Sequence, residues 1–190
     1  MNVADTLRSL SIDSSLARNL SAFSTLFEKW NRSINLSAAS NHAEITEHLV
    51  DSLHIVPHLV DRTHVLDVGS GGGFPVVIAA ICLPSVEFTS LEPVHKKHAF
   101  LRTAARELRL PNLDARAERI EDHGASDYDA AMSRATFDLV EWLTRGRERV
   151  AASGIVLGFE AVPRNDLPST TTRHPYDLGG KQRAIVIDRR

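Results

Sequence analysis

The fold of this chain is decided by residues 67–75, which read Asp67-Val68-Gly69-Ser70-Gly71-Gly72-Gly73-Phe74-Pro75. They follow an apolar run, residues 64–68, that is typical of a short buried strand. A turn from such a strand into a helix needs glycine, because a side chain would block the approach of a ligand to the backbone. The dinucleotide pattern G-x-G-x-x-G is only partly met, since its third glycine falls on Phe74. The pattern D-x-G-x-G-x-G fits instead.

An acidic residue follows the next predicted strand, residues 86–91. Glu92 comes 19 residues after Gly73, and a carboxylate there accepts hydrogen bonds from both ribose hydroxyls of an adenosine. Strand, glycine loop, helix, strand and acid together predict a cofactor that contains adenosine. For the glycine cluster taken alone, a simple turn is the alternative.

The rest of the chain alternates helices and strands. Apolar residues at helical spacing predict a helix over 16–30, capped by Asp13, and a second over about 43–60 that ends or kinks near Pro57. Further helices are expected at about 74–83, 94–110 and 137–150, and strands at 64–68, 86–91, 113–117, 128–133, 154–159 and 183–187. The last two strands are joined by a connection that contains Pro, Thr and Gly179-Gly180.

This order predicts an α/β fold. The sheet is Rossmann-like and mostly parallel, with an antiparallel C-terminal edge, and N-terminal helices precede it. We expect one domain over residues 1–190, with a helical part at 1–62 and a cofactor-binding core at 63–190. The 190 residues are 43% hydrophobic, enough for one core.

Composition narrows the function. The net charge of −2 gives no global positive field, so binding to nucleic acid would need a local basic patch. The single cysteine, Cys82, allows no disulfide within the chain, which suits a reducing cytosol. The sequence shows neither a signal peptide nor an apolar run of roughly 20 residues that would span a bilayer. We therefore expect a cytoplasmic monomer without a membrane partner.

Several motifs carry a resemblance to a known family. They are Trp30-Asn31-Arg32-Ser33-Ile34-Asn35-Leu36, His48-Leu49-Val50-Asp51-Ser52-Leu53, the glycine loop 67–75, Lys96-Lys97 with Phe100-Leu101-Arg102, Arg116-Ala117-Glu118 and Ser133-Arg134-Ala135. On these residues, the chain from about Trp30 to the last strand resembles the ribosomal RNA small-subunit methyltransferase G family, also called glucose-inhibited division protein B. The glycine motif is common to class I methyltransferases, whereas the other motifs are more specific when they occur in this order.

The resemblance implies that S-adenosylmethionine is the cofactor and that a guanine N7 in a decoding-region loop of 16S rRNA is methylated. The small ribosomal subunit is then the partner. By carry-over from the family, the cofactor would be surrounded by Gly69, Gly71, Gly73, Phe74, Glu92, Ala117 and Glu118. Asp67 would either bind near the cofactor amine or brace the glycine turn. Arg134 would lie near the transferred methyl group or the RNA, and His48 and Asp51 are further candidates for the substrate side.

The residues agree with this chemistry. N7 of guanine carries a lone pair and no proton, so methyl transfer to it needs placement and shielding but no general base. No Asn-Pro-Pro-Tyr or Asp-Pro-Pro-Tyr segment follows the fourth strand, and Cys82, at the apolar end of a helix, fits a structural thiol better than a nucleophile. We therefore expect catalysis by positioning, with Arg134 as a fixed hydrogen-bond donor or phosphate contact.

Each candidate has a plain alternative. Arg134 would then pair with an acid at the sheet edge, and His48 and Asp51 would be surface residues of a packing helix. A solvated helix face explains a basic stripe as well as RNA binding does; the stripe comprises Lys96, Lys97, Arg102, Arg106 and Arg109. The spacings His54/His58 and His95/His98 lack the acid or cysteine partners of a metal site, so none is expected.

Two departures from the family pattern bear on the substrate. The family usually has a Lys-Gly pair after its fifth strand, where this chain has Glu160-Ala161, and the missing lysine removes a cation. The acid after the second strand is commonly Asp-Ser and is Glu92-Pro93 here, which should preserve ribose binding. The rival functions are methyl transfer to another RNA, a protein or a small molecule, NAD(P)-dependent oxidation, and a non-catalytic module that senses the cofactor or binds RNA.

Overall fold

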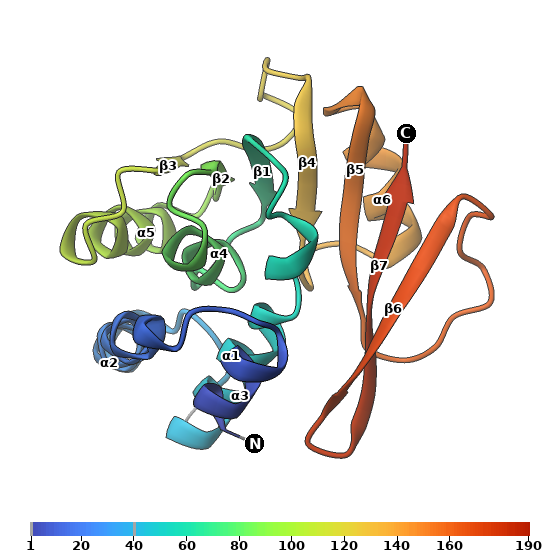
Figure 1. Ribbon diagram of the computed structural model, residues 1–190. Coiled ribbons are helices and arrows are strands. Elements are labelled where there is room, and N and C mark those ends of the chain that lie inside the picture. Colours follow the sequence, from blue (N-terminus) through green and yellow to red (C-terminus); the bar gives the residue numbers. More distant parts are fainter. Residues whose placement is uncertain (1, 40) are drawn as a thin grey trace.

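The computed structural model, drawn in Figure 1, describes residues 2–39 and 41–190. In this part of the chain, seven strands form one sheet in the order β3-β2-β1-β4-β5-β7-β6. Their bounds are β1 His64–Val68, β2 Glu87–Leu91, β3 Leu113–Arg116, β4 Tyr128–Ser133, β5 Val150–Glu160, β6 Thr171–Leu178 and β7 Lys181–Arg189. Strands β1 to β5 are parallel, and β7 and β6 run antiparallel to their neighbours. The predicted α/β sheet with an antiparallel C-terminal edge is confirmed.

The N-terminal helices differ from the prediction in several places. They are α1 Val3–Ser9, α2 Ala17–Ile34 and α3 His42–Leu53, with 3-10 turns η1 Ser14–Leu16 and η2 Val56–His58. Helix α1 was not predicted, α2 extends to Ile34, and α3 ends early. The Asp13 side chain accepts a hydrogen bond from the backbone of Ser15 and so caps η1, ahead of α2. The predicted helix over 43–60 was wrong beyond Leu53. Pro57 lies in the first turn of η2, where its missing N–H costs nothing.

Three helices connect the parallel strands: α4 Val76–Cys82, α5 His95–Glu107 and α6 Leu139–Arg147. All three are shorter than predicted. The helix predicted to reach residue 110 stops early because Arg109 takes a φ of +55°, which a right-handed helix does not contain.

Two hydrophobic clusters cover the two faces of the sheet. The first joins the N-terminal helices, α4 and α5 to one face, and the second joins α6 to the other. Because side chains alternate along a strand, Val65 belongs to the first cluster and Leu66 to the second. Among the described residues, the structure holds no helix of the length and apolar character needed to cross a membrane.

Strand β6 lies where a connecting loop was predicted. This edge strand is mostly exposed and contains Pro175, so it lacks the alternating apolar pattern of a half-buried strand. It pairs with β7 through a two-residue turn, Gly179-Gly180, in which both residues have positive φ, +63° and +86°. In Figure 1 this hairpin, coloured orange to red, extends past the main sheet toward the N-terminal helices.

Candidate functional site

The glycine loop after β1 and the segment after β4 lie side by side, at the point where the strand order reverses. Ser133 Oγ donates to the carbonyl of Val68 at 2.8 Å, and Thr136 Oγ1 donates to that of Gly69 at 3.2 Å. Gly69 has a φ of +74°, and a Cβ there would overlap the Thr136 side chain. In open α/β sheets ligands bind at this reversal, so the two segments mark the expected ligand site.

Glu92 holds the glycine loop in place. Its Oε2 accepts the backbone N–H of Gly71 and its Oε1 accepts that of Val94, both at 2.8 Å. The side chain is buried, and each oxygen keeps a further lone pair that can accept another hydrogen bond. The carboxylate therefore links the ends of β1 and β2 and retains the capacity to accept bonds from ribose hydroxyls.

Asp67 carries a buried carboxylate. Within residues 2–39 and 41–190, neither of its oxygens has a hydrogen bond of good geometry, although the Ser70 hydroxyl of the glycine loop lies close by. Burial raises the pKa of Asp67 to about 7; the Ser70 hydroxyl opposes this rise and the nearby Glu92 carboxylate adds to it. An orphaned buried acid at a ligand site requires an explanation. The ammonium group of a bound amino acid moiety, such as the methionine part of S-adenosylmethionine, fits it.

The segment after β3 lies next to Glu92, because the backbone N–H of Glu92 donates to the carbonyl of Arg116 at 3.0 Å. Ala117 is exposed there. The Glu118 carboxylate contacts Nδ1 of buried His123 at 2.8 Å. The structure therefore brings residues 117 and 118 close to Glu92, with the Glu118 side chain engaged by His123 of the following loop.

Phe74, at the end of the glycine loop, joins the sheet to the N-terminal helices. Its ring packs edge-on against Phe23 and Phe27 of α2, with centroids 5.1 and 5.0 Å away. The His48 ring of α3 lies 5.7 Å from it. The residue that breaks the dinucleotide pattern thus closes the loop against α2 and α3.

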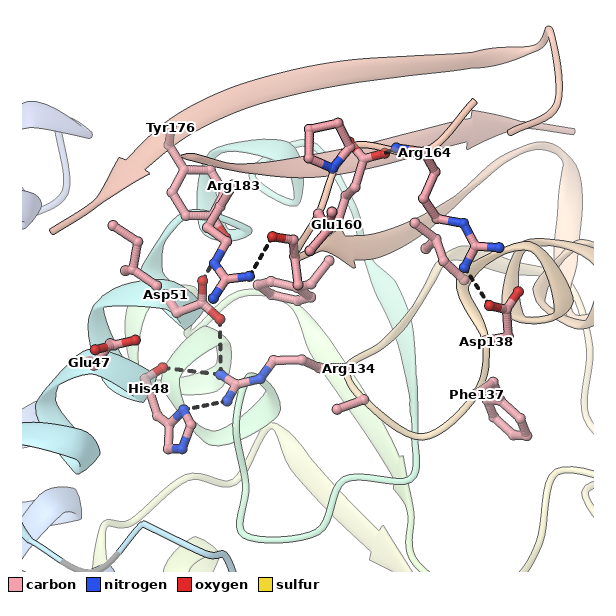
Figure 2. Close-up of a pocket in the computed structure, with 17 residues that line it drawn as sticks. Glu47, His48, Asp51, Arg134, Phe137, Asp138, Glu160, Arg164, Tyr176 and Arg183 are labelled. Carbon is pink, nitrogen blue, oxygen red and sulfur yellow. Dashed lines mark hydrogen bonds and ion pairs between the residues drawn. The ribbon is translucent and has the colours of Figure 1, made fainter. Parts of the chain in front are cut away.

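Arg134, His48 and Asp51 come together, as Figure 2 shows. Arg134 Nη1 lies 3.3 Å from Asp51 Oδ2, and its Nη2 donates to His48 Nδ1 at 2.6 Å. A guanidinium can only donate, so Nδ1 of His48 is unprotonated and the ring proton lies on Nε2. Burial lowers the pKa of His48, and the charge of Arg134 lowers it further. The plain alternative for Arg134 was an ion pair with an acid at the sheet edge. Arg134 is ion-paired, but its partner Asp51 belongs to helix α3, and the contacts join the three substrate-side candidates.

A cavity of about 540 Å³ opens beside Arg134. Phe137 and Phe159 form apolar walls, while Arg164 and Arg183 bring further positive charge. The Arg134 guanidinium carbon lies 5.9 Å from the Phe74 ring centroid and 5.8 Å from that of Phe159, so Arg134 separates the glycine loop from the cavity. The cavity collects residues from the ends of β4 and β5, from α3 and from the hairpin.

Most residues of this cavity were not predicted from the sequence, among them Arg164, Tyr176 and Arg183. Tyr176 Oη donates to Asp51 Oδ1 at 2.6 Å, and Arg183 Nη1 donates to the carbonyl of Ala161 at 2.6 Å. None of these three belongs to a motif, and two of them lie on the β6–β7 hairpin. The Gly179-Gly180 turn is the sequence signal that would have indicated the hairpin, and with it Tyr176 and Arg183.

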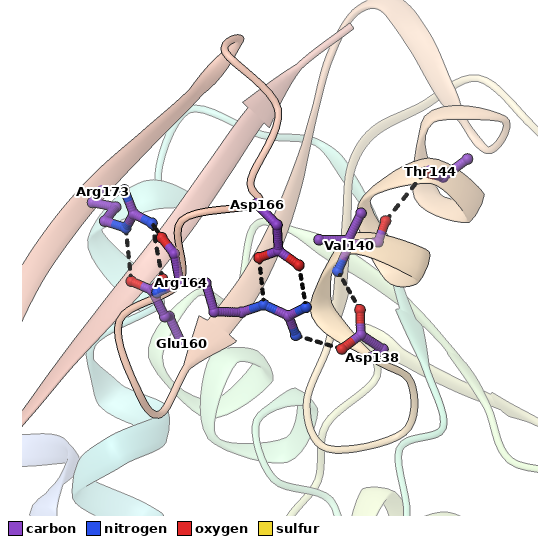
Figure 3. Close-up of polar contacts among 7 residues, drawn as sticks. All are labelled: Asp138, Val140, Thr144, Glu160, Arg164, Asp166 and Arg173. Carbon is purple, nitrogen blue, oxygen red and sulfur yellow. Dashed lines mark hydrogen bonds and ion pairs between the residues drawn. The ribbon is translucent and has the colours of Figure 1, made fainter.

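Where the family usually has a lysine after its fifth strand, this chain has Glu160, which belongs to an ion-pair cluster drawn in Figure 3. Buried Glu160 accepts hydrogen bonds from Nε and Nη2 of Arg173, at 2.9 and 3.1 Å, and from the backbone of Arg164 at 2.9 Å. The Arg164 side chain pairs with Asp138 and Asp166. The cavity lining therefore contains Arg164 and Arg183, but the charge of Arg164 is paired with Asp138 and Asp166. Four carboxylates, those of Glu47, Asp51, Asp138 and Glu160, line the cavity as well.

The remaining candidates lie elsewhere. In the basic stripe Lys96, Arg102, Arg106 and Arg109 are exposed and Lys97 is half-buried. Among the described residues no group of three or more His, Cys, Asp or Glu side chains is arranged to hold a metal ion. His54 and His58 contact Tyr176 and His174 instead. Burial raises the pKa of the Cys82 thiol to about 12, which disfavours the thiolate that a nucleophile needs.

Comparison with known proteins agrees with the fold. The model of the rRNA small subunit methyltransferase G family matches residues 16–166. The ribosomal RNA small subunit methyltransferase G of Aromatoleum aromaticum is 34% identical, over 90% of this chain and 88% of the relative. That of Nitrosococcus oceani is 37% identical, over 85% and 76%.

Solved structures show the same fold at low identity. The S-adenosylmethionine-dependent methyltransferase SibL has a TM-score of 0.63 at 19% identity, over 77% of this chain and 56% of its own, so this chain spans just over half of it. A putative O-methyltransferase from Klebsiella pneumoniae has a TM-score of 0.61 at 13% identity, over 88% and 90%.

Sheet, glycine loop and acid after β2 define a class I S-adenosylmethionine-dependent methyltransferase. More particularly, the chain belongs to the ribosomal RNA small subunit methyltransferase G family. The resemblance and the cofactor predicted from the sequence are confirmed.

Proposed function

We propose that this enzyme methylates N7 of a guanine in 16S rRNA of the small ribosomal subunit. The observation that carries the proposal is the position of Arg134, which is buried between Phe74 of the glycine loop and Phe159 of a cavity about 540 Å³ in size. A cavity of this size admits a nucleobase, and Arg134 and Arg183 in its lining are potential phosphate contacts. The names of the relatives support ribosomal RNA as the substrate class.

On the cofactor side, S-adenosylmethionine supplies a methyl group bonded to a positively charged sulfur. The proposed roles follow from the polar groups present. Asp67 binds the ammonium group, since its carboxylate has no other partner in the described chain. Glu92 accepts from the ribose hydroxyls with its remaining lone pairs, Gly69, Gly71 and Gly73 admit the ligand to the backbone, and Phe74, Ala117 and Glu118 border it.

On the acceptor side, N7 of guanine needs no general base, so the residues act by placement. Phe137 and Phe159 offer apolar surface to the base. Arg134 donates to the guanine or to a neighbouring phosphate, while His48 and Asp51 fix the direction of its guanidinium. All of their contacts with Arg134 use Nη1 and Nη2.

Three coarser expectations complete the proposal. We infer that the enzyme works in the cytoplasm, where small subunits are assembled, and as a monomer. Residues 1–190 form one domain, with the helices of 1–62 packed on the core of 63–190. The first hydrophobic cluster supports this, because it contains Phe23 of α2 and Phe100 of α5 together.

The test is methyl transfer to hypomethylated small ribosomal subunits with radiolabelled S-adenosylmethionine, followed by mapping of the labelled nucleotide. Label at one guanine N7 is the expected result. Label on another atom, or tight cofactor binding without label, would turn the proposal toward another acceptor or toward a non-catalytic module.

The role of Arg134 is tested in the same assay. We expect Arg134→Ala to lower kcat/KM by about tenfold to a hundredfold, the loss expected for a charged hydrogen bond. Arg8→Ala, which removes an exposed guanidinium from α1, serves as the control and should be neutral. Full activity of a folded Arg134→Ala enzyme would contradict the assignment.

A further inference from the structure

The β6–β7 hairpin reaches the candidate site through one side chain. Tyr176 of β6 is half-buried, and its Oη donates to Asp51 Oδ1 of α3 at 2.6 Å. Figure 2 shows the phenol pointing toward Asp51 at the edge of the cavity. Burial raises the pKa of Tyr176, and the Asp51 carboxylate raises it further, so the hydroxyl remains protonated and acts as a donor.

The acceptor of this bond is the carboxylate that pairs with Arg134. Asp51 uses Oδ1 for Tyr176 and Oδ2 for Arg134, the latter at 3.3 Å. Arg134 in turn donates to His48 Nδ1 at 2.6 Å. A single chain of polar contacts therefore runs from the hairpin through α3 to the arginine at the carboxyl end of β4.

The phenol is held in place by its surroundings. The Tyr176 ring stacks on His54, with centroids 3.9 Å apart and planes within 12°. Asp51 is in α3 and His54 is the C-cap residue of that helix. Because they are three residues apart, they face the same side, and both contact Tyr176. Two further pairs join the hairpin to the N-terminal helical part. The rings of His58 and His174 have centroids 4.5 Å apart, and Lys181 Nζ donates to Glu47 Oε1 at 2.6 Å.

We propose that Tyr176 is a positioning residue for Arg134, and that the β6–β7 hairpin is thereby part of the methyl-transfer site. The proposal rests on the proposed function for its kinetic consequence, though not for the contact itself. Tyr176 does not touch the reacting atoms. Its hydroxyl fixes the rotamer of Asp51, so that Oδ2 faces the guanidinium.

A carboxylate bonded to one donor on each oxygen has a defined orientation. Without the phenol hydroxyl, Oδ1 of Asp51 would seek water or another donor, and the carboxylate would rotate about its χ2 angle, which has a broad energy well. Arg134 would then populate several directions. Because methyl transfer depends on placement, loss of this order should lower kcat more than it weakens substrate binding.

The decisive comparison is between the two tyrosines of the chain. Tyr176→Phe removes the hydroxyl that bonds Asp51. Tyr128→Phe removes an equally bonded hydroxyl, which contacts His123 at 2.8 Å beneath the other face of the sheet. Each enzyme is assayed for methyl transfer to hypomethylated small subunits. The pKa of His48 is followed by NMR of its ring protons, assigned with a His48→Gln variant.

We expect Tyr176→Phe to lower kcat about tenfold with little change in KM. Thr25→Val, which removes an exposed hydroxyl from α2, is the kinetic control and should leave both unchanged. Tyr128→Phe is the control for the His48 titration alone, because His123 also contacts Glu118. The pKa of His48 should rise in Tyr176→Phe, because release of Arg134 removes a positive charge from beside the ring. It should stay constant in Tyr128→Phe. A purely structural role for Tyr176 would not move this titration.

A double-mutant cycle guards against an indirect effect. If Tyr176 acts through Asp51, Tyr176→Phe should have no further effect on kcat in an Asp51→Asn background. An equal loss in both backgrounds would overturn the proposal, and so would an unchanged His48 titration in a folded Tyr176→Phe protein. Failure of the unmodified enzyme to methylate the particle would refute the proposed function instead, and the His48 titration would still decide the role of Tyr176.

Discussion

At the scale of single residues, the buried carboxylate of Asp67 is the group in the site that most needs a hydrogen-bond or ionic partner. Its carboxylate is buried without a hydrogen bond in the described chain, and its pKa of about 7 lies above the ordinary 3.8. Between these values the folded protein binds more protons than the unfolded chain, so this residue makes stability fall as the pH rises from about 4 to about 7. A bound cation would offset that cost.

The first prediction concerns stability without cofactor. Asp67→Asn should be more stable than the unmodified protein at pH 8, by on the order of a few kcal/mol, and the difference should shrink toward pH 4. Denaturant unfolding at pH 4, 6 and 8 measures it. A difference that does not change with pH would show that Asp67 is ionised at no cost in the folded state.

The second prediction concerns the same carboxylate with its ligand. If Asp67 binds the ammonium group, it must lose its proton, so the Kd of S-adenosylmethionine should increase as the pH falls below about 7. Asp67→Asn should bind more weakly and lose this pH dependence. Calorimetry at several pH values provides the measurement, and a pH-dependent Kd retained in the variant would assign the proton to another group.

The third prediction concerns Gly72, which is not among the alternating glycines of the motif. A Cβ at this position would lie 2.5 Å from the edge of the Phe27 ring of α2. Gly72→Ala should therefore destabilise the protein by about 1–3 kcal/mol through overpacking. The double variant Gly72→Ala/Phe27→Leu should recover part of the lost stability, because leucine leaves more room for the added methyl group. If denaturant unfolding shows no destabilisation by Gly72→Ala, α2 can shift to accommodate the methyl group at little cost.

At the scale of elements, one ion pair joins α6 to the hairpin. Fully buried Asp188 of β7 accepts a hydrogen bond from Nη2 of Arg147 at 2.8 Å, and one from Thr170 at 2.6 Å. Burial alone would raise the pKa of Asp188, but the bonds from Arg147 and Thr170 outweigh it and the pKa is lowered. Such a group stabilises the fold above the ordinary pKa of 3.8, and that contribution is lost as the pH falls through the lower folded value.

The fourth prediction follows from this pair. Arg147→Ala leaves the Asp188 charge buried with one neutral partner, which should cost about 2–4 kcal/mol at pH 7. The loss should diminish in acid, where Asp188 becomes protonated. Denaturant unfolding of the unmodified protein and of Arg147→Ala at pH 7 and pH 3 tests this. Arg145→Ala is the control and should change stability little, because Arg145 pairs only with exposed carboxylates. An Arg147→Ala loss equal at both pH values would assign its cause to packing.

At the scale of the whole molecule, the N-terminal helices and the sheet share one hydrophobic cluster. Phe23 and Phe27 of α2 pack with Phe74 of the glycine loop and Phe100 of α5, at centroid distances between 5.0 and 6.3 Å. Removing α2 would uncover these rings. The helices of 1–62 should therefore not unfold separately from the core of 63–190.

The chain carries two tryptophans that test this fifth prediction. Trp30 lies on α2, against Phe100, and Trp142 lies on α6, on the opposite face of the sheet. In single-tryptophan variants, Trp30→Phe and Trp142→Phe, fluorescence should report the same denaturant dependence as circular dichroism for the respective variant. Separate transitions within either variant would show two units instead of one domain.

The sequence by itself determined the features that depend on neighbours along the chain. Strands β1 and β4 have the predicted bounds, and the glycine loop and Glu92 lie where the pattern put them. A turn with positive φ leaves its glycines in the sequence, and a buried strand leaves an apolar run. Strand β6 was predicted as a loop because an exposed edge strand leaves no apolar run, and its Gly179-Gly180 turn was the remaining local sign of the hairpin.

Only the tertiary structure decided which side chains meet at the substrate side. Arg134 contacts His48 across 86 residues of sequence, and Tyr176 contacts Asp51 across 125. The motifs marked Arg134, His48 and Asp51 as separate candidates, but no local pattern pairs a helix residue with a residue on a distant edge strand. That pairing depends on how α3 packs and where the hairpin projects, which are properties of the assembled core.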